Sequence, residues 1–179
     1  MKLPDTTAAP HPLPSAERMQ MLFFDAAREG RGDVIEALLV YGAVIDAHDG
    51  KGHTALILAA YHDRLAALNL LLMHGADPDA GDIARGNTAL MGAAFKGHDA
   101  VAARLVAAGC TVNARNKAGQ TALMMAAMFG RDDQVDMLLA AGADRDAVDA
   151  AGNTAASLAA GQRNAAMVAR LSAPQRHAA

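Results

Sequence analysis

The feature that most constrains the fold is a segment that recurs about every 33 residues. The stretches HTALILAA, NTALMGAA, QTALMMAA and NTAASLAA carry a threonine at positions 54, 88, 121 and 154, so the interval from one to the next is nearly constant. A second landmark is the glycine at positions 42, 75, 109 and 142 in YGAVIDA, HGADPDA, AGCTVNA and AGADRDA, which recurs at the same interval. Two landmarks with one period predict an array of similar units that bury a continuous core between neighbours.

Each unit carries signals for two short helices followed by a loop. The threonine precedes an apolar run, as in the helix expected from Thr54 to Tyr61, and its hydroxyl can accept a backbone N–H of the first turn. Glycines such as Gly97 and Gly130 are expected to end the first helices, because the left-handed conformation costs least there. A second helix is expected from Asp132 to Ala141, where apolar residues recur at helical spacing. The next segment, GADRDAVDAAGNT, has Asp and Gly at turn-forming positions and predicts an extended hairpin.

The composition fits a folded helical domain and disfavours several other classes. Hydrophobic residues make up 53% of the chain, too many for a mostly disordered protein, and only 3% are aromatic, which predicts a core of Ala, Leu, Val and Met. The net charge is −3 and the Lys and Arg residues are scattered, so no nucleic-acid partner is expected. Every apolar stretch is interrupted well short of the roughly 18 residues that a membrane span needs, so no membrane partner is expected.

The N-terminal segment MKLPDTTAAPHPLPSAER has Pro, Asp and Thr where a secretory signal peptide needs an unbroken apolar region. We therefore expect a cytoplasmic protein, or a periplasmic or secreted one if a leader has been removed. The single cysteine, Cys110, lies where neighbouring units carry Ala, and we expect it to be a small buried residue. The Ala-rich, Cys-poor composition also suggests a bacterial source.

The repeated segments resemble the ankyrin repeat, whose pattern is approximately D-x-x-G-x-T-P-L-H-x-A-A-x-x-G-H, then an apolar helix, then L-L-x-x-G-A-D-x-N-A. GHDAVAARLVAAG and GRDDQVDMLLAAGADRDA match it almost position for position. The resemblance implies an all-α repeat solenoid of about five helix-turn-helix units joined by β-hairpin loops. It implies one domain over residues 19–172, between a flexible Pro-containing tail (1–18) and a C-terminal tail (173–179). Units one to five are expected at 20–49, 50–82, 83–116, 117–149 and 150–172. Unit one has Met21 in place of the threonine.

Two departures from the family pattern bear on packing and specificity. The family's histidine is replaced by Ile57, Met91, Met124 and Ser157, so we expect fewer polar links between neighbouring units and a greater dependence on burial. The third unit is longer than the others, because one more position separates its glycine landmark from its threonine landmark than in the other units. The extra residue falls in the loop around GDIARGN. It is either a local specificity element or a tolerated insertion, and the sequence leaves both open.

The resemblance implies that a partner protein binds the concave side, which the loop tips and the exposed side of each first helix form. The two exposed positions of the first helices follow each Ala-Ala pair, and in units two to four they include three aromatic residues. Tyr61, Phe95 and Met128 would share one column, with Phe129 beside it, and form an apolar stripe. The alternative is that these rings fold back onto neighbouring helices and only cover Ala-rich packing. The expected partner-binding residues are Tyr61, His62, Phe95, Lys96, Met128, Phe129, Lys51, His53, Arg85, Asn87, Lys117 and Gln120.

Other functions have weaker support in the sequence. The seven histidines show no short metal-ligand spacing with Cys or with one another, and every glycine is explained by a helix end or a turn, so no catalytic residue, metal or cofactor is expected. We therefore predict a non-catalytic scaffold that is itself a monomer. The alternatives are a self-associating structural array and a metal or ligand site at the His-bearing hairpin tips, near His48 and His53.

Overall fold

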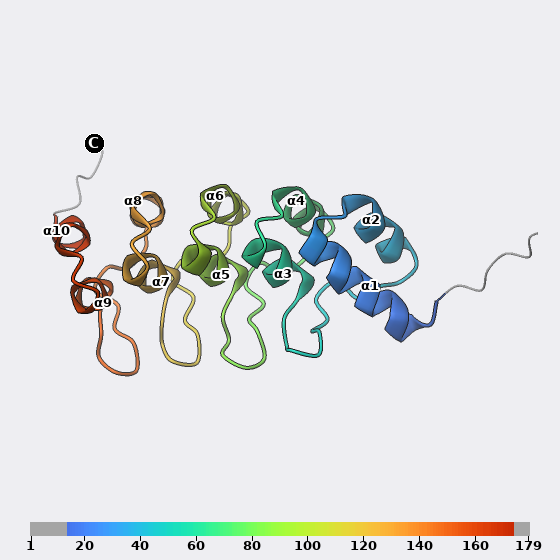
Figure 1. Cartoon of the computed structure of the whole chain (residues 1–179), viewed down its shortest axis with the longest axis horizontal. Coiled ribbons are helices and arrows are strands. Elements are labelled where there is room, and N and C mark those ends of the chain that lie inside the picture. The colour runs from blue at the N-terminus through green and yellow to red at the C-terminus, as the bar shows by residue number, and fades with distance from the viewer. Residues whose placement is uncertain (1–13, 174–179) are drawn as a thin grey trace, which may run out of the picture.

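The computed structural model describes residues 14–173, and within them the chain forms five stacked pairs of helices (Figure 1). The first helix of each pair lies in one layer, the second helix lies in another, and the loops between units project together from the first layer. This arrangement confirms the predicted all-α repeat solenoid. The helices are α1 (Ala16–Glu29), α2 (Gly32–Val40), α3 (Ala55–Tyr61), α4 (Leu65–Met73), α5 (Ala89–Lys96), α6 (Asp99–Ala107), α7 (Ala122–Met128), α8 (Asp132–Ala140), α9 (Ala155–Gly161) and α10 (Ala165–Ser172).

The threonine of each repeated segment caps a first helix, as predicted. The Oγ1 atoms of Thr54, Thr88, Thr121 and Thr154 accept the backbone N–H three residues later, at 3.2, 3.4, 3.3 and 3.2 Å. Gly97 ends α5 in the left-handed conformation, and Gly130, with φ 65°, follows the end of α7 by two residues. The local signals therefore predicted the helix starts and the turns between paired helices.

Unit one differs from the prediction at its start. Helix α1 begins at Ala16, with Ser15 as its N-cap, and Met21 lies inside this 14-residue helix. The helix therefore begins within the segment 1–18 that the sequence assigned to a flexible tail. Phe23 and Phe24 lie in the second half of this helix and are both buried. The rest of the expected tails, residues 1–13 and 174–179, lies outside the described residues.

The core runs between the first helices of neighbouring units. Leu56, Leu90 and Leu123 occupy equivalent positions there and are buried. The residues at the family's histidine position in units two to four, Ile57, Met91 and Met124, are buried as well, as predicted from the sequence. Cys110 is also buried, and burial raises the pKa of its thiol to about 11, which confirms its interpretation as a small core residue.

Although apolar residues replace the family's histidine in units two to four, other side chains form polar links between neighbouring units. The Arg64 Nε donates to the carbonyl of Arg28 at 3.0 Å, and His98 Nε2 lies 3.1 Å from the carbonyl of Tyr61. These side chains follow the turn of one unit and reach the end of the preceding first helix, so they satisfy carbonyls that the helix itself leaves free. Apolar burial and helix-end hydrogen bonds therefore hold neighbouring units together.

The loops form hairpin turns that are tied to one another, but the predicted β-hairpin pairing is minimal. Within residues 14–173 the chain has no named strand, and its single isolated β-bridge joins His48 to Thr54. Adjacent hairpins share one backbone hydrogen bond each: Ile83 N to Gly52 O, Lys117 N to Arg85 O, and Ala150 N to Ala118 O, at 2.9, 2.8 and 2.9 Å. The hairpin tips therefore form a connected wall beside the first helices.

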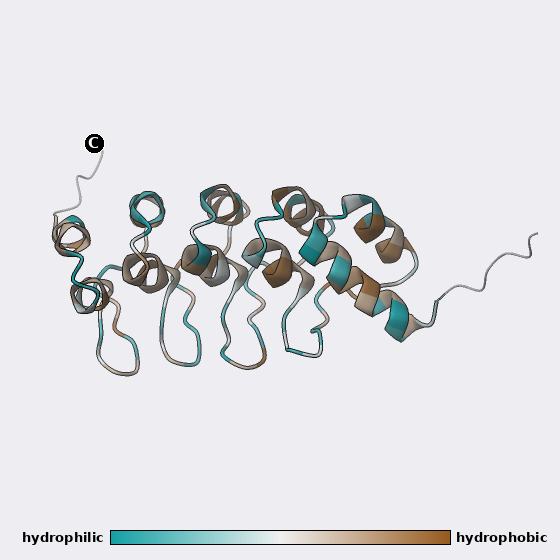
Figure 2. Ribbon diagram, in the orientation of Figure 1, coloured by the Kyte–Doolittle hydropathy of each residue, from teal (hydrophilic) through white to brown (hydrophobic). Residues whose placement is uncertain are grey.

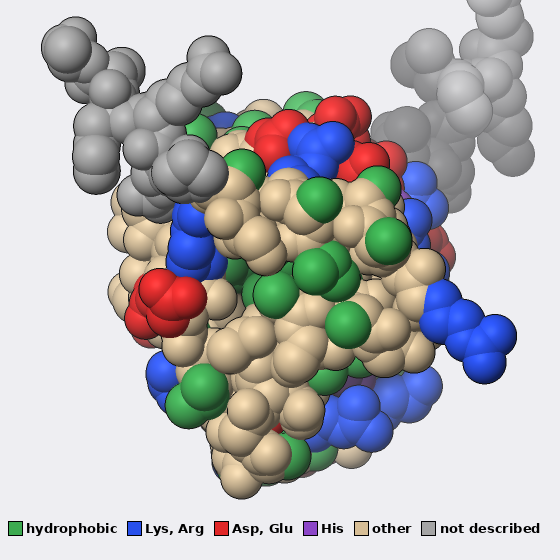
Figure 3. Space-filling view, turned by 90° about the vertical axis from the view of Figure 1, so that its left-hand side faces the viewer, with side chains coloured by type: hydrophobic (Ala, Val, Ile, Leu, Met, Phe, Trp, Pro, Cys, Tyr) green, Lys and Arg blue, Asp and Glu red, His purple; other side chains and the backbone are tan. Residues whose placement is uncertain are grey.

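Hydrophobic residues are concentrated in the helices, whereas the hairpins are largely neutral or hydrophilic (Figure 2). The C-terminal end of the array shows hydrophobic side chains as separate spots among polar side chains and backbone (Figure 3). No large exposed hydrophobic residue lies beyond Val148 in the described part of the chain. Within the described residues, the exposed surface of unit five therefore lacks large apolar side chains.

Candidate interaction groove

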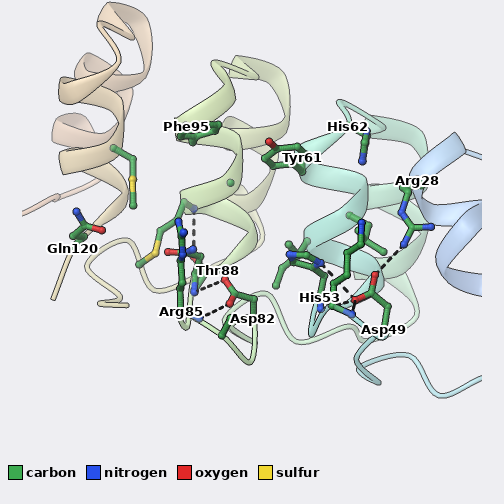
Figure 4. Close-up of a pocket in the computed structure, with 18 of the residues that line it drawn as sticks. Arg28, Asp49, His53, Tyr61, His62, Asp82, Arg85, Thr88, Phe95 and Gln120 are labelled. Atoms are coloured by element: carbon green, nitrogen blue, oxygen red, sulfur yellow. Dashed lines mark hydrogen bonds and ion pairs between the residues drawn. The ribbon is translucent and has the colours of Figure 1, made fainter. Parts of the chain in front are cut away.

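An open groove of about 800 Å³ runs along the concave side, between the first helices and the wall of hairpin tips (Figure 4). It crosses units two to four and reaches the end of α1. The residues that line it are Arg28, Asp49, Lys51, His53, Ile57, Leu58, Tyr61, His62, Asp82, Ala84, Arg85, Asn87, Thr88, Met91, Gly92, Phe95, Gln120, Met125, Met128 and Phe129. None of them belongs to a second helix. The groove is therefore built entirely from first helices and hairpins.

Three aromatic rings, Tyr61, Phe95 and Phe129, form one edge of the groove, and we call them the aromatic ladder. The Tyr61 and Phe95 rings stack with centroids 6.2 Å apart, and Phe95 meets Phe129 edge to face at 4.6 Å. Their exposed fractions are 40%, 37% and 39%. The Lys96 Nζ lies 4.9 Å from the centroid of the Tyr61 ring. The ladder thus spans three units and keeps more than a third of each residue accessible.

The ladder corrects the predicted stripe in one detail. The sequence placed Tyr61, Phe95 and Met128 in one column with Phe129 beside it, but the ring contact runs from Phe95 to Phe129. Phe129 is the C-cap of α7, and Met128 is half-buried in the same groove. Each ring packs on a ring of a neighbouring unit and still presents an accessible surface.

A recess lies at Gly92, inside α5. Equivalent positions in the neighbouring first helices carry Leu58 and Met125, and all three residues line the groove. A Cβ atom added to Gly92 would meet no atom within 4 Å, so the space above this glycine is open. Gly92 is not among the expected site residues, and its place inside α5 shows that the expectation that every glycine lies at a helix end or a turn is wrong. The sequence did carry a signal for it: a glycine inside a helix destabilises that helix by roughly 0.5–1 kcal/mol relative to alanine, so its presence there suggests another role.

The two carboxylates of the groove are engaged by their own hairpins. Asp49 Oδ1 accepts the backbone N–H groups of Lys51 and His53, both at 2.9 Å, and its Oδ2 accepts the Arg28 guanidinium at 2.9 Å. Asp82 accepts the N–H groups of Arg85 and Asn87 at 2.6 and 3.0 Å. Burial acts to raise the pKa of the Asp49 carboxyl, but these N–H groups and the nearby positive charges hold it below its ordinary value.

The Lys and Arg side chains of the groove differ, because Arg28 pairs with Asp25 and Asp49 whereas the other two form no ion pair among the described residues. Lys51 and Arg85 are exposed, and neither forms an ion pair with any residue in the range 14–173. Burial, followed by the positive charges of Arg28, Arg64, Lys96 and His98, lowers the pKa of His62. The concave surface of units two and three is therefore locally positive, although the whole chain has a net charge of −3.

Ten of the twelve predicted partner-binding residues line the groove, and the other two lie beside it. Lys96 sits over the Tyr61 ring, while Lys117 lines a smaller adjoining recess and donates through Nζ to the carbonyl of Ile83 at 2.6 Å. The groove-lining residues outside the predicted set include Arg28, Asp49, Asp82, Gly92 and Met125. The sequence pattern gives no local signal that Asp49 and Asp82, whose carboxylates accept hairpin N–H groups, also line the groove.

The longer hairpin of unit three places Arg85 where the main groove meets the smaller adjoining recess. Asp82 N donates to Asn87 O at 2.9 Å, whereas the shorter hairpin of unit two closes from Asp49 N to His53 O at 2.9 Å. Arg85 lines both the main groove and the smaller recess. The extra residue therefore changes the shape of the groove wall at Arg85.

The structure also bears on the other functions weighed from the sequence. His53 Nδ1 lies 3.5 Å from Asp49 Oδ1, and His48 Nε2 lies 3.1 Å from the Gly81 carbonyl, so both histidines contact hairpin groups. Within the described residues no group of three or more His, Cys, Asp or Glu side chains could hold a metal ion. From residue 14 to 173, no helix has both the length and the apolar character needed to cross a membrane.

Comparison with known proteins agrees with this architecture. The family model described as ankyrin repeats (3 copies) matches residues 22–116 and 90–177. Human Ankyrin repeat domain-containing protein 63 is 42% identical over 76 residues, which are 42% of this chain and 20% of that protein. The mouse protein of the same name is 42% identical over 76 residues, which are 42% of this chain and 19% of that protein. Ankyrin repeat domain-containing protein SAT10 of Stachybotrys chartarum is 38% identical over 96 residues, 54% of this chain and 5% of that protein.

The chain spans a fifth or less of the length of these relatives. They come from human, mouse and a fungus, so they do not support the bacterial source that the composition suggested. Ankyrin repeats are generally non-catalytic modules of protein–protein interaction. With matches that together cover most of its length, the chain belongs to the ankyrin repeat family.

Proposed function

We propose that this protein is a non-catalytic interaction scaffold that binds a partner protein in its concave groove. The observation that carries the proposal is the aromatic ladder, in which Tyr61, Phe95 and Phe129 contact one another across three units yet each remain about two-fifths exposed. Exposed aromatic residues set among polar groups are typical of the centre of protein interfaces. The fold itself does not explain why such rings should face solvent.

The polar wall opposite the ladder can supply selectivity. The hairpins contribute Lys51, His53, Arg85, Asn87 and Gln120, which together offer donors and acceptors around the apolar strip. Backbone hydrogen bonds between neighbouring hairpins, and the bond that Asn116 Nδ2 donates to Asn87 Oδ1, hold the wall in place before a partner arrives, which lowers the ordering cost of binding. An apolar centre with a polar rim fits a protein surface better than a uniformly charged polymer.

Site-specific photocrosslinking tests which face binds. Phe95 is replaced by p-benzoylphenylalanine, which keeps an aromatic ring in the groove, and the matched control places the same residue at exposed Ala103 on α6, outside the groove. After irradiation in the source cells, we expect a defined protein adduct from position 95 and none from position 103. Adducts of equal yield from both positions would contradict the proposal. A covalent dimer of this chain at position 95 would instead assign the groove to self-association.

A further inference from the structure

We infer that the groove binds an extended acidic segment of the partner, with one large apolar side chain of that segment seated in the recess at Gly92. This inference rests on the proposed function, because it specifies the chemistry of the partner that the groove would hold. It depends on three observations. These are the open space at Gly92, the contrast between buried carboxylates and unpaired cations in the groove, and the shape of the groove.

The recess supplies an apolar seat of defined position. It lies between Leu58 and Met125 along the row of first helices, and the Phe95 ring follows one helical turn after Gly92. A Cβ atom at Gly92 would meet nothing within 4 Å, so a side chain from outside can occupy that space without displacing this protein's own atoms. Filling it removes apolar surface of both partners from water, which favours a large apolar side chain over a small or polar one.

The charges around the recess select for an acidic segment. The carboxylates of Asp49 and Asp82 are only 7% exposed, each accepts two backbone N–H groups, and Asp49 is also paired with Arg28, so an incoming cation has little access to them. Lys51 and Arg85 project from the hairpin tips without an ion pair among the described residues. Lys96 adds a third cation next to the ladder. An incoming carboxylate therefore finds available donors, whereas an incoming Lys or Arg meets like charge.

The shape of the groove favours an extended segment over a compact ligand. It is an open trough that runs across three units in line, with helices on one side and hairpin tips on the other. Each repeat presents similar positions along its length, so a chain lying in the trough meets one unit after another. A strand-like peptide can thereby place one side chain in the recess and its neighbours beside the cations.

The test is selection from a random 12-residue peptide library displayed on phage, with the full chain as target. We expect the enriched peptides to contain several Asp or Glu residues around one Phe, Leu, Met or Trp. Fluorescence anisotropy with the synthetic peptides should show an affinity loss of about tenfold or more for Gly92→Leu, which fills the recess. The double variant Lys51→Ala/Arg85→Ala should lose affinity to a similar extent and should weaken the dependence of binding on salt.

A matched control separates recess filling from a general effect of the substitution. Gly161→Leu adds the same side chain to the first helix of unit five, outside the groove, where a Cβ also meets no atom within 4 Å, and it should leave peptide affinity unchanged. Thermal melts establish that each variant is folded. If Gly92→Leu unfolds the protein, Gly92→Ala replaces it and is expected to give a smaller loss in the same direction.

Three outcomes would overturn the inference. Enriched peptides that are basic, enriched peptides whose affinity is the same for Gly92→Leu, or no enrichment at all would each contradict it. The proposed function stands in the first two cases if Tyr61→Ala/Phe95→Ala still weakens the selected peptides, and in the third if position 95 still crosslinks a protein. Selected peptides that bind this double variant as tightly as the natural chain would contradict both proposals.

Discussion

Units two to four and unit five share one fold but present different concave surfaces. The two positions that follow the Ala-Ala pair carry Tyr61 and His62, Phe95 and Lys96, and Met128 and Phe129 in the central units. In unit five they carry Gly161 and Gln162. Unit five nevertheless forms α9, which begins at the same threonine cap, and α10. An ankyrin unit can therefore fold without aromatic side chains at these positions, which separates the aromatic ladder from the requirements of the fold.

The cores of these units differ as well. The buried leucine of the central units, Leu56, Leu90 or Leu123, is replaced by Ala156, and the buried residue that follows it is replaced by exposed Ser157. Ser157 compensates locally, because its Oγ accepts the Thr154 N–H at 2.9 Å and completes a capping box. Unit five thus depends more on local hydrogen bonds, whereas the central units depend on burial between neighbours.

The largest effect is expected from truncating the core of a central unit. Leu123→Ala should lower the free energy of unfolding by roughly 2–5 kcal/mol, because Leu123 is fully buried and its removal leaves a cavity. Leu158→Ala, at a half-buried position of unit five, should lower the free energy of unfolding clearly less than Leu123→Ala does. Urea unfolding followed by circular dichroism measures both. Equal losses would show that the end unit is as tightly packed as the centre.

Truncating the ladder should have a smaller effect on stability. Phe95→Ala is expected to lower the free energy of unfolding by about 1–2 kcal/mol, because the Phe95 ring is partly exposed and contributes two aromatic contacts. The same urea titration applies, with Leu123→Ala as the reference. A loss as large as that of Leu123→Ala would mean that the ladder is part of the core, and the contrast between fold and concave surface would fail.

Filling the recess by one methyl group should stabilise the protein. Gly92→Ala is expected to raise the free energy of unfolding by about 0.5–1 kcal/mol, because alanine is the better helix former and its Cβ meets open space. Gly161→Ala, at the last residue of α9, is the matched control and should gain less. Destabilisation by Gly92→Ala would show that the recess is not open and would remove the physical basis of the apolar seat.

The smallest effect is expected in the acid dependence of stability. Since the pKa of Asp49 is lowered in the folded protein, its contribution is present above its ordinary value of 3.8 and is lost as the pH falls through the lower folded value. Asp49→Asn should therefore reduce the fall in stability on acidification below that value. Asn116 occupies the equivalent hairpin position and shows that asparagine supports the turn. Urea unfolding at pH 7, 5 and 3 tests this, and an unchanged pH dependence would contradict it.

Local sequence patterns predicted much of the fold. The threonine caps and the turns followed from the repeat period and the propensities of neighbouring residues, whereas the buried positions 57, 91 and 124 followed from the resemblance to the ankyrin pattern. The hydrogen bonds from Arg64 and His98 to the preceding unit could not be predicted in this way, because they depend on how units stack. The contact of Phe95 with Phe129, not Met128, depends on the end of α7, and the recess at Gly92 depends on what surrounds a missing side chain.

The central claim is that the aromatic ladder serves binding more than folding. Its most direct test is the affinity of the Tyr61→Ala/Phe95→Ala variant for the partner that crosslinks to position 95, with Val40→Ala/Met73→Ala, at exposed sites outside the groove, as control. We predict that the dissociation constant rises at least about tenfold for the ladder variant, which stays folded at the assay temperature, and is unchanged for the control. An unchanged affinity together with a sharp loss of thermal stability would contradict the claim.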